Sequence, residues 1–209
     1  MTEIRIAEAS VDRFDDVEHA LTGGGDGASC WCQWWMLRAK DFSASSRDER
    51  RELLRSDLEA PVASALLAYV DGEAAGWVKV SPRPDQPRLS RTRNLQQSPE
   101  PFDDASVWAI TCFVVRREHR GAGVANRLLA AAVDHARAHG ARVIEGYPID
   151  TDRTKASSND LFHGALRASP TPDSPRSPAP PGPTDRLAHP RVTPPTSPCR
   201  RRAVRESTA

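Results

Sequence analysis

The sequence predicts an α/β domain, of the α+β kind, built on a mixed sheet. An apolar strand, an amphipathic helix and a second apolar strand follow one another over residues 107–147, which is the order of a right-handed β-α-β crossover. Upstream, Asp71-Gly72 separates two apolar runs and has the residue types of a two-residue hairpin turn. A crossover gives parallel strands and a hairpin gives antiparallel ones, so a sheet that contains both is mixed.

The chain begins with a short strand and a helix. Ile4 and Ile6 flank a polar residue, as in a strand with one buried face. Ser10 has the side chain of a helix N-cap, and apolar residues follow at i, i+3 and i+7: Phe14, Val17 and Leu21. The glycine-rich run at 23–27 ends this helix.

A second helix is expected from about Ser46 to Glu59, where Pro61 stops it. Three leucines are expected on one face of this helix: Leu53, Leu54 and Leu58. The hairpin strands follow at 63–70 and 74–80.

Residues 81–104 are polar, rich in Pro and Arg, and long enough to be a functional loop. Its arginines are expected to be solvated, with selection of an acidic acceptor as the alternative: Arg83, Arg88, Arg91 and Arg93.

The strand at 107–115 is apolar on both faces and is therefore expected inside the sheet, covered on both sides. Thr111, Phe113 and Val115 should share one face with Val107 and Ala109. The next helix carries a stripe of apolar residues, namely Ala125, Leu128, Leu129, Ala132, Val133 and Ala136.

Gly140 ends that helix, and a strand is expected at 141–147. A last helix is expected from near Ser158, with four apolar residues: Leu161, Phe162, Ala165 and Leu166.

Composition excludes several function classes. The 29 basic and 28 acidic residues give a formal net charge of +1, so no whole-chain field favours nucleic acid or an anionic membrane. The N-terminus lacks the pattern of a secretory signal, and no apolar run approaches the length of a membrane span. We therefore expect a cytoplasmic protein, with neither nucleic acid nor membrane as a partner.

Residues 168–209 differ sharply from the rest of the chain. They contain 11 of the 18 prolines and no aromatic residue. Such a segment cannot bury enough apolar surface to offset the entropy of ordering, so we expect a folded domain at 1–167 and a disordered tail at 168–209. Pro, Arg, Ala and Ser also dominate GC-rich codons read out of register, so the tail is interpreted as a frameshift product, with a purpose-built extension as the alternative.

The cysteines do not form a secreted disulfide framework. Cys30 and Cys32 stand close together, and Cys112 is the third cysteine before the tail. Zinc in a thiolate site needs four ligands, so reduced, partly buried thiols are expected and no metal site is predicted.

The segment Arg120-Gly121-Ala122-Gly123-Val124-Ala125 lies between the inner strand and its helix. Free N–H groups and the positive end of the helix dipole meet there, which predicts an anion-binding turn. The turn has no Lys-Ser or Lys-Thr pair, which argues against a loop that binds a nucleotide triphosphate. Asn126 stands where a dinucleotide-binding motif has its third Gly or Ala, which argues against that motif. Glycines that serve only a tight turn remain the alternative.

This turn resembles motif A of the GNAT N-acetyltransferase superfamily, with Arg120, Gly123 and Ala125 at its signature positions. The order of the predicted elements is similar to that fold up to about residue 166, and three further segments are similar to an uncharacterised bacterial branch. The resemblance implies a GNAT-like mixed sheet with acetyl-CoA as cosubstrate. The cofactor-binding residues that it implies are Phe113, Val114, Val115, Arg120, Gly121, Ala122, Gly123, Val124, Ala125 and Asn126.

Catalytic residues are less well marked. The inner strand holds no carboxylate where several family members keep a glutamate base. Glu145 and Tyr147, two positions apart on the neighbouring strand, are the candidates for acid–base roles, and surface or packing roles are the alternative. Weaker candidates are Asp103, Asp104 and His119. Three tryptophans at 31–35 are either core anchors or a wall that binds a cationic acceptor.

The expected activity is transfer of the acetyl group of acetyl-CoA to the amine of a small molecule. The chain departs from the family at about Arg167, where two closing strands are expected but no strand pattern follows. The alternative is therefore a non-catalytic CoA-binding or interaction protein. A homodimer stays open.

Overall fold

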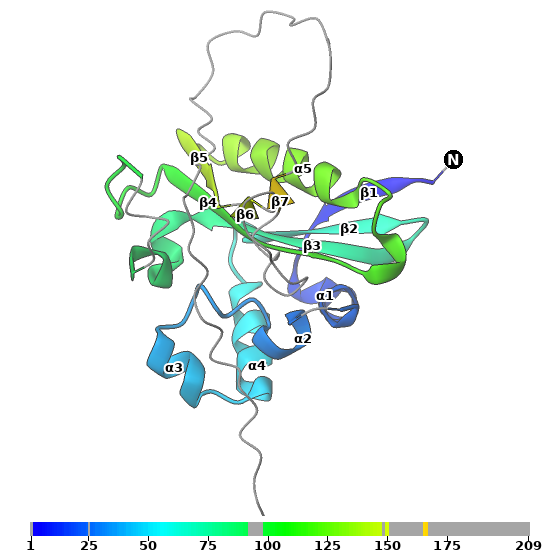
Figure 1. Cartoon of the computed structure of the whole chain (residues 1–209), viewed down its shortest axis with the longest axis horizontal. Coiled ribbons are helices and arrows are strands. Elements are labelled where there is room, and N and C mark those ends of the chain that lie inside the picture. Colours follow the sequence, from blue (N-terminus) through cyan, green and yellow to red (C-terminus); the bar gives the residue numbers. More distant parts are fainter. Residues whose placement is uncertain (1, 25, 92–97, 148, 151–164, 167–209) are drawn as a thin grey trace, which may run out of the picture.

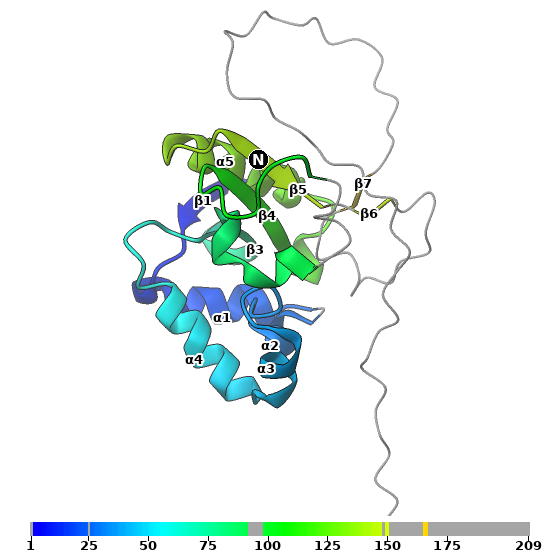
Figure 2. The same ribbon diagram turned by 90° about the vertical axis from the view of Figure 1, so that its left-hand side faces the viewer.

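The computed structural model describes residues 2–24, 26–91, 98–147, 149–150 and 165–166. A sheet of five strands lies between two helical layers (Figures 1 and 2). Its strands, in spatial order, are β1 (Ile4–Glu8), β2 (Ala65–Val70), β3 (Glu73–Pro82), β4 (Val107–Val115) and β5 (Val143–Gly146). Neighbouring strands are antiparallel except β4 and β5, which are parallel, so the prediction of a mixed sheet is confirmed.

Four helices lie on one side of the sheet and a long helix lies on the other (Figure 2). The first group is α1 (Phe14–Thr22), α2 (Gly27–Cys30), α3 (Ala39–Ala44) and α4 (Arg47–Asp57), and the long helix is α5 (Val124–Ala138). Alternate residues of the strands enter separate cores on the two sides: Leu67 and Trp77 pack with α1 and α4, whereas Leu66 and Val78 pack with α5. Among the described helices, none is long and apolar enough to cross a membrane.

The prediction of helix α1 is confirmed, but the prediction that Ser10 is its N-cap is wrong. Phe14, Val17 and Leu21 are buried as expected. A 3-10 turn, η1 (Val11–Arg13), precedes the helix, and Ser10 makes no side-chain cap bond. Its hydroxyl instead accepts a hydrogen bond from Arg13 Nη1 at 3.3 Å.

Helix α4 begins with a capping box. The Glu49 N–H donates to Ser46 Oγ at 3.1 Å, and the Ser46 N–H donates to Glu49 Oε2 at 2.6 Å. Leu54 and Leu58 are buried, but Leu53 is 40% exposed and lines a hollow between α3 and α4. The prediction that the three leucines share one face is therefore wrong for Leu53.

The hairpin between β2 and β3 has the predicted turn. Asp71 and Gly72 have φ values of 48° and 92°, the two positive angles that a type I′ turn requires. The Asp71 side chain also accepts a hydrogen bond from the Glu3 N–H at 2.9 Å, which ties the turn to β1.

Strand β4 contains a bulge at Thr111. Lys79 pairs with Cys112, but the next residue of β3, Val80, pairs with Ile110. Thr111 therefore has no partner on β3, and the alternation of side chains reverses across it. Phe113 and Val115 lie on the α5 side, the same side as Trp108 and Ile110, so the predicted sharing of a face with Ala109 is wrong.

Helix α5 packs through a slightly different stripe from the predicted one. Its buried residues are Val124, Leu128, Ala132, His135 and Ala136. Leu129 is 41% exposed and Ala125 is exposed, so these two members of the predicted stripe lie outside the buried face of the helix. The stripe shifts because Val124 and Leu128 seat the helix against Gly76 of β3, where an added Cβ would lie 3.1 Å from each.

The chain after β5 departs from the predicted last helix. Ala165–Leu166 forms strand β7, which pairs in parallel with β6 (Ile149–Asp150), so the helix is wrong at these two residues. The rest of that segment, with Leu161 and Phe162, and the predicted tail at 168–209 lie outside the described residues.

Candidate active site

One edge of β4, called the open edge below, has no strand partner among the described residues over the second half of the strand. Pairing with β5 covers Val107–Ile110 and ends at Gly146, whereas pairing with β3 continues to Val115. From Cys112 onward, β4 therefore has no strand partner on the side away from β3 within the described ranges. Phe113, Val114 and Val115 are half-buried there. An extended ligand carrying amide groups can pair with such an edge as an added strand does.

The open edge leads directly into the glycine turn. Gly121 and Gly123 have φ values of 83° and 82°, and α5 begins at Val124. The helix bond nearest its start is donated by the Arg127 N–H to the Gly123 carbonyl at 3.1 Å. The N–H groups of residues 121–126 make no hydrogen bond to another described residue. Free donors, the positive helix end and open space beside both glycines together suit a phosphate.

Side chains on both flanks hold this turn. Arg120 Nε donates to the Val115 carbonyl at 3.1 Å, which braces the end of β4. Arg116 Nη1 donates to the His19 carbonyl at 2.5 Å, which ties the turn to α1. The ten residues that the sequence implied for the cofactor thus occupy two adjoining segments.

Glu145 and Tyr147 lie together on the face of β5 away from α5. The Tyr147 hydroxyl donates to Glu145 Oε2 at 2.7 Å. Ile144, which precedes Glu145 in sequence, belongs to the α5 core, whereas Tyr147 packs with Trp35, Leu89 and Ala109 on the opposite side. The predicted sharing of one face is confirmed, and both side chains are buried.

The Glu145 carboxylate is enclosed by other polar groups. Arg83 Nη1 donates to Glu145 Oε2 at 3.0 Å, and Ser98 Oγ donates to Glu145 Oε1 at 2.5 Å. Burial, followed by the nearby negative charge of Glu145, raises the pKa of Tyr147, so the phenol is neutral at physiological pH.

Arg83 is the group that sequence reasoning missed. The interpretation of the loop arginines as solvated is wrong for it, because its side chain is 0% exposed. The short helix η2 (Arg83–Asp85) turns it inward, where its guanidinium also donates to the carbonyls of Glu100 and Pro101. Neither periodicity nor composition marks this arginine in the sequence.

Arg88 is likewise engaged within the protein. Its guanidinium lies 3.5 Å from the centre of the Trp34 ring, and burial lowers its pKa. Trp31 and Trp35 are buried. The tryptophan segment therefore serves mainly as a core anchor, and the Trp34 face already holds a cation. Arg91 is exposed, and Arg93 lies outside the described residues.

The weaker acid–base candidates lie elsewhere or are committed to other partners. Asp104 accepts hydrogen bonds from Ser106 and Arg142, which lower its pKa to about 2. Asp103 is exposed, and both aspartates precede β4, whereas the turn follows it. His119 Nε2 lies 3.6 Å from Glu73 Oε2.

The cysteines before the tail are free thiols, as expected. Cys32 Sγ lies 3.1 Å from Cys112 Sγ in the core, and Trp77 Nε1 donates to Cys32 Sγ. Groups of described side chains that can hold a metal ion include no cysteine.

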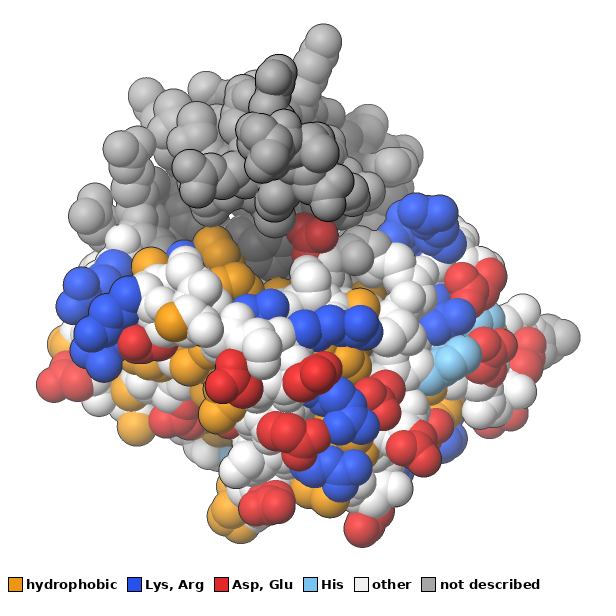
Figure 3. Space-filling view, turned by 90° about the horizontal axis from the view of Figure 1, so that it is seen from below, with side chains coloured by type: hydrophobic (Ala, Val, Ile, Leu, Met, Phe, Trp, Pro, Cys, Tyr) orange, Lys and Arg blue, Asp and Glu red, His pale blue; other side chains and the backbone are white. Residues whose placement is uncertain are grey.

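The hollow between α3 and α4 has a volume of about 810 Å³ and lies away from the glycine turn. Its rim carries Asp41, Asp48 and Glu52. On this face of the molecule, acidic and basic side chains are interspersed and no large patch of one sign forms (Figure 3).

The chain is similar to proteins of one known family. The family model "Acetyltransferase (GNAT) family" matches residues 31–159. No curated protein sequence matches the chain. Solved structures with a similar fold include a GCN5-related N-acetyltransferase from Kribbella flavida, with 14% identity, a TM-score of 0.43, and coverage of 72% of this chain and 31% of that one.

Two further structures are similar at the level of the fold. Aminoglycoside N-acetyltransferase AAC(6′)-Iy in complex with CoA has 17% identity and a TM-score of 0.45, with coverage of 84% of this chain and 96% of that one. Diaminobutyrate acetyltransferase EctA from Paenibacillus lautus has 16% identity and a TM-score of 0.39, with coverage of 69% and 64%. The family match spans more than half of the sequence, so the chain belongs to the GNAT acetyltransferase family.

Proposed function

We propose that this protein transfers the acetyl group of acetyl-CoA to the amine of a small molecule. The observation that carries the proposal is the junction of the open β4 edge with the free N–H groups of the glycine turn. Acetyl-CoA carries a pyrophosphate, an arm with amide groups and a reactive thioester in that order. The turn and the open edge offer an anion site and an amide-pairing edge in the same order.

In this proposal the N–H groups of Gly121 to Asn126 bind the pyrophosphate, because they lie at the positive end of α5 and the space beside Gly121 and Gly123 is open. Arg120 braces the turn and contributes positive charge. The backbone of Phe113 to Val115 pairs with the arm. The thioester then supplies an activated acetyl group on the side of the sheet where Tyr147 lies.

Acetyl transfer requires that one proton moves from the attacking amine to the leaving thiolate. The amine nitrogen attacks the acetyl carbonyl, the carbon–sulfur bond breaks, and the amine loses a proton while the thiolate gains one. We assign the first transfer to Tyr147, whose oxygen accepts the amine proton as its own proton passes to Glu145 over the 2.7 Å hydrogen bond. The return of that proton through Tyr147 neutralises the thiolate.

A second candidate function is a non-catalytic CoA-binding protein. The observation that favours it is the pairing of Glu145 with Arg83 and Ser98, because both carboxylate oxygens already accept hydrogen bonds within the protein. The same contacts suit a structural network under the sheet.

Thiol release during incubation with acetyl-CoA and primary amines separates the two functions. The amines include an aminoglycoside and a diamino acid, and mass spectrometry identifies acetylated products. Transfer that disappears in Gly123→Val supports the enzyme. Acetyl-CoA binding without transfer to any amine supports the second candidate, and absence of both activities contradicts the shared cofactor assignment.

A further inference from the structure

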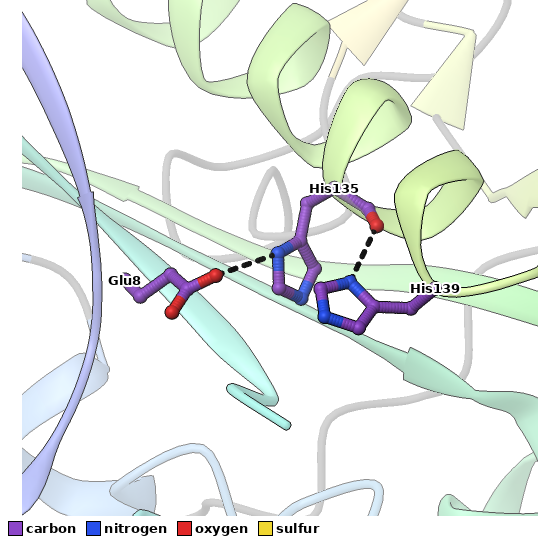
Figure 4. Close-up of side chains that lie close together, drawn as sticks. All are labelled: Glu8, His135 and His139. Carbon is purple, nitrogen blue, oxygen red and sulfur yellow. Dashed lines mark hydrogen bonds and ion pairs between the residues drawn. The ribbon is translucent and has the colours of Figure 1, made fainter. Parts of the chain in front are cut away.

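Three side chains with metal-ligating atoms meet at the end of α5 away from the glycine turn. Glu8 comes from the end of β1, His135 lies in the last turn of α5, and His139 is the residue that caps the end of this helix (Figure 4). One ligand atom from each residue lies within 4.8 Å of the other two. We propose that these three residues form a binding site for one Zn²⁺ ion.

The backbone fixes which nitrogens are available. His135 Nε2 lies 2.8 Å from the Ala63 carbonyl, and His139 Nδ1 lies 2.9 Å from the His135 carbonyl. A carbonyl oxygen only accepts, so each of these nitrogens carries a proton. In a neutral imidazole the other nitrogen then has a free lone pair, which leaves His135 Nδ1 and His139 Nε2 as ligands. Zinc-binding histidines are typically oriented by a carbonyl in this way.

The contact between His135 and Glu8 has a spacing that suits two ligands of one ion. His135 Nδ1 lies 3.3 Å from Glu8 Oε1 (Figure 4). Ligands bound to zinc at about 2.0–2.1 Å in a tetrahedron are separated by about 3.3–3.4 Å. The observed separation matches that spacing.

The surroundings also suit a bound ion. His135 is 8% exposed, and the Trp108 ring lies against both imidazoles, with centroid distances of 5.9 and 6.2 Å. This apolar wall keeps the two rings in place and lowers the local polarity. His139 and Ala63 also line a hollow of about 410 Å³, which gives an ion access from solvent.

Two imidazoles and one carboxylate leave a fourth tetrahedral position open for water. An ion held there joins β1 to α5 and therefore stabilises the packing of the helix on the sheet. The sequence signal is the i, i+4 spacing of His135 and His139, which reasoning from the cysteines alone overlooks.

The test measures Zn²⁺ binding to untagged full-length protein that has been stripped with a chelator. Competition against a chromophoric chelator should give one Zn²⁺ per chain, and Zn²⁺ should raise the melting temperature. His139→Gln and Glu8→Gln change partly exposed side chains, so neither removes a core residue. Each should weaken Zn²⁺ binding at least tenfold and remove the rise in melting temperature.

A second group of metal-ligating residues supplies the control. Glu73, Glu118 and His119 also lie close together, but this group has a single histidine and exposed carboxylates. His119→Gln should leave Zn²⁺ affinity unchanged. The proposal is overturned if no stoichiometric Zn²⁺ binds, or if His119→Gln abolishes binding while His139→Gln and Glu8→Gln do not.

Discussion

The Tyr147 hydroxyl donates to Glu145 Oε2 at 2.7 Å, and both side chains are buried on the face of β5 opposite α5. Arg83 contacts the same carboxylate oxygen at 3.0 Å. The Tyr147 phenol, which packs against Trp35, is therefore hydrogen-bonded to a carboxylate that also forms an ion pair with Arg83. Its role in proton transfer and its role in packing give different predictions.

Replacement of Tyr147 by Phe tests proton transfer. The ring and its packing remain, but the hydroxyl that receives the amine proton is lost. We expect kcat to fall by about 100-fold or more, with the affinity for acetyl-CoA unchanged. Steady-state rates of thiol release and calorimetric titration measure the two effects. Equal kcat values for Tyr147→Phe and wild type would remove Tyr147 from the mechanism.

Replacement of Arg83 by Met tests the buried ion pair. Glu145 is 3% exposed, so loss of its guanidinium partner leaves a buried carboxylate without a positive charge beside it. We expect the free energy of unfolding to fall by about 3–5 kcal/mol in denaturant titrations.

Arg38→Met is the matched control, because Arg38 pairs with Asp41 at the surface, at 3.0 Å. It should change stability by about 0.5 kcal/mol or less. Similar losses for the two variants would show that burial of Arg83 does not matter.

Gln86 holds the bulge of β4 in place. Its side chain is buried; Nε2 donates to the Ala109 carbonyl at 3.1 Å, and Oε1 accepts from Thr111 Oγ1 at 2.8 Å. Gln86→Met keeps the volume but removes buried hydrogen bonds to the Ala109 carbonyl, Ser81 Oγ and Thr111 Oγ1, so stability should fall by about 1–3 kcal/mol.

A double variant isolates the Thr111 part of this effect. Adding Thr111→Val removes the hydroxyl that has lost its Gln86 partner, and this should recover part of the lost stability. Strict additivity of the two single changes in denaturant titrations would exclude a direct coupling between Gln86 and Thr111.

Tyr69 predicts a pH dependence of stability. Burial, together with the hydrogen bond to Asp16 at 2.6 Å, raises the pKa of Tyr69 to about 12 from 10.0. The unfolded chain loses this proton near pH 10 and the folded chain does not, so the unfolded state binds fewer protons in this window. Stability should therefore be fully present below pH 10 and should fall as the pH rises toward 12.

Tyr69→Phe is the test of this sign. Its free energy of unfolding should fall less between pH 10 and 12 than that of wild type, measured by urea titration at each pH. Parallel curves for the two proteins would show that Tyr69 ionises equally in both states.

The regular elements were predictable from the sequence because they depend on local patterns. Asp71-Gly72 requires two positive φ angles, and the stretch from Val107 to Tyr147 carries the periods of a strand, a helix and a strand. These patterns also placed the glycine turn between β4 and α5. Glu145 and Tyr147 share a face because side chains alternate along a strand.

The remaining features depend on tertiary contacts. The bulge at Thr111 reverses the faces of Phe113 and Val115, and the side chain that holds it comes from a distant loop. Arg83 is buried because it pairs with the Glu145 carboxylate on β5, and no local sequence pattern around Arg83 indicates that partner. Leu129 is exposed because the packing of Val124 and Leu128 against Gly76 fixes which face of α5 is turned toward the sheet.

The central claim is that the turn before α5 binds the pyrophosphate of acetyl-CoA. Gly123 and Gly140 stand at the two ends of α5 with φ values of 82° and 86°, and an added Cβ meets no atom within 4 Å at either position. Valine therefore causes similar backbone strain at both positions, but only position 123 adjoins the proposed phosphate site.

Calorimetric titration with acetyl-CoA compares wild type, Gly123→Val and Gly140→Val. The account predicts that Gly123→Val binds at least tenfold more weakly, about 1.4 kcal/mol or more, while Gly140→Val binds as wild type does. Equal affinity of Gly123→Val and wild type, or equal losses in the two variants, would contradict it.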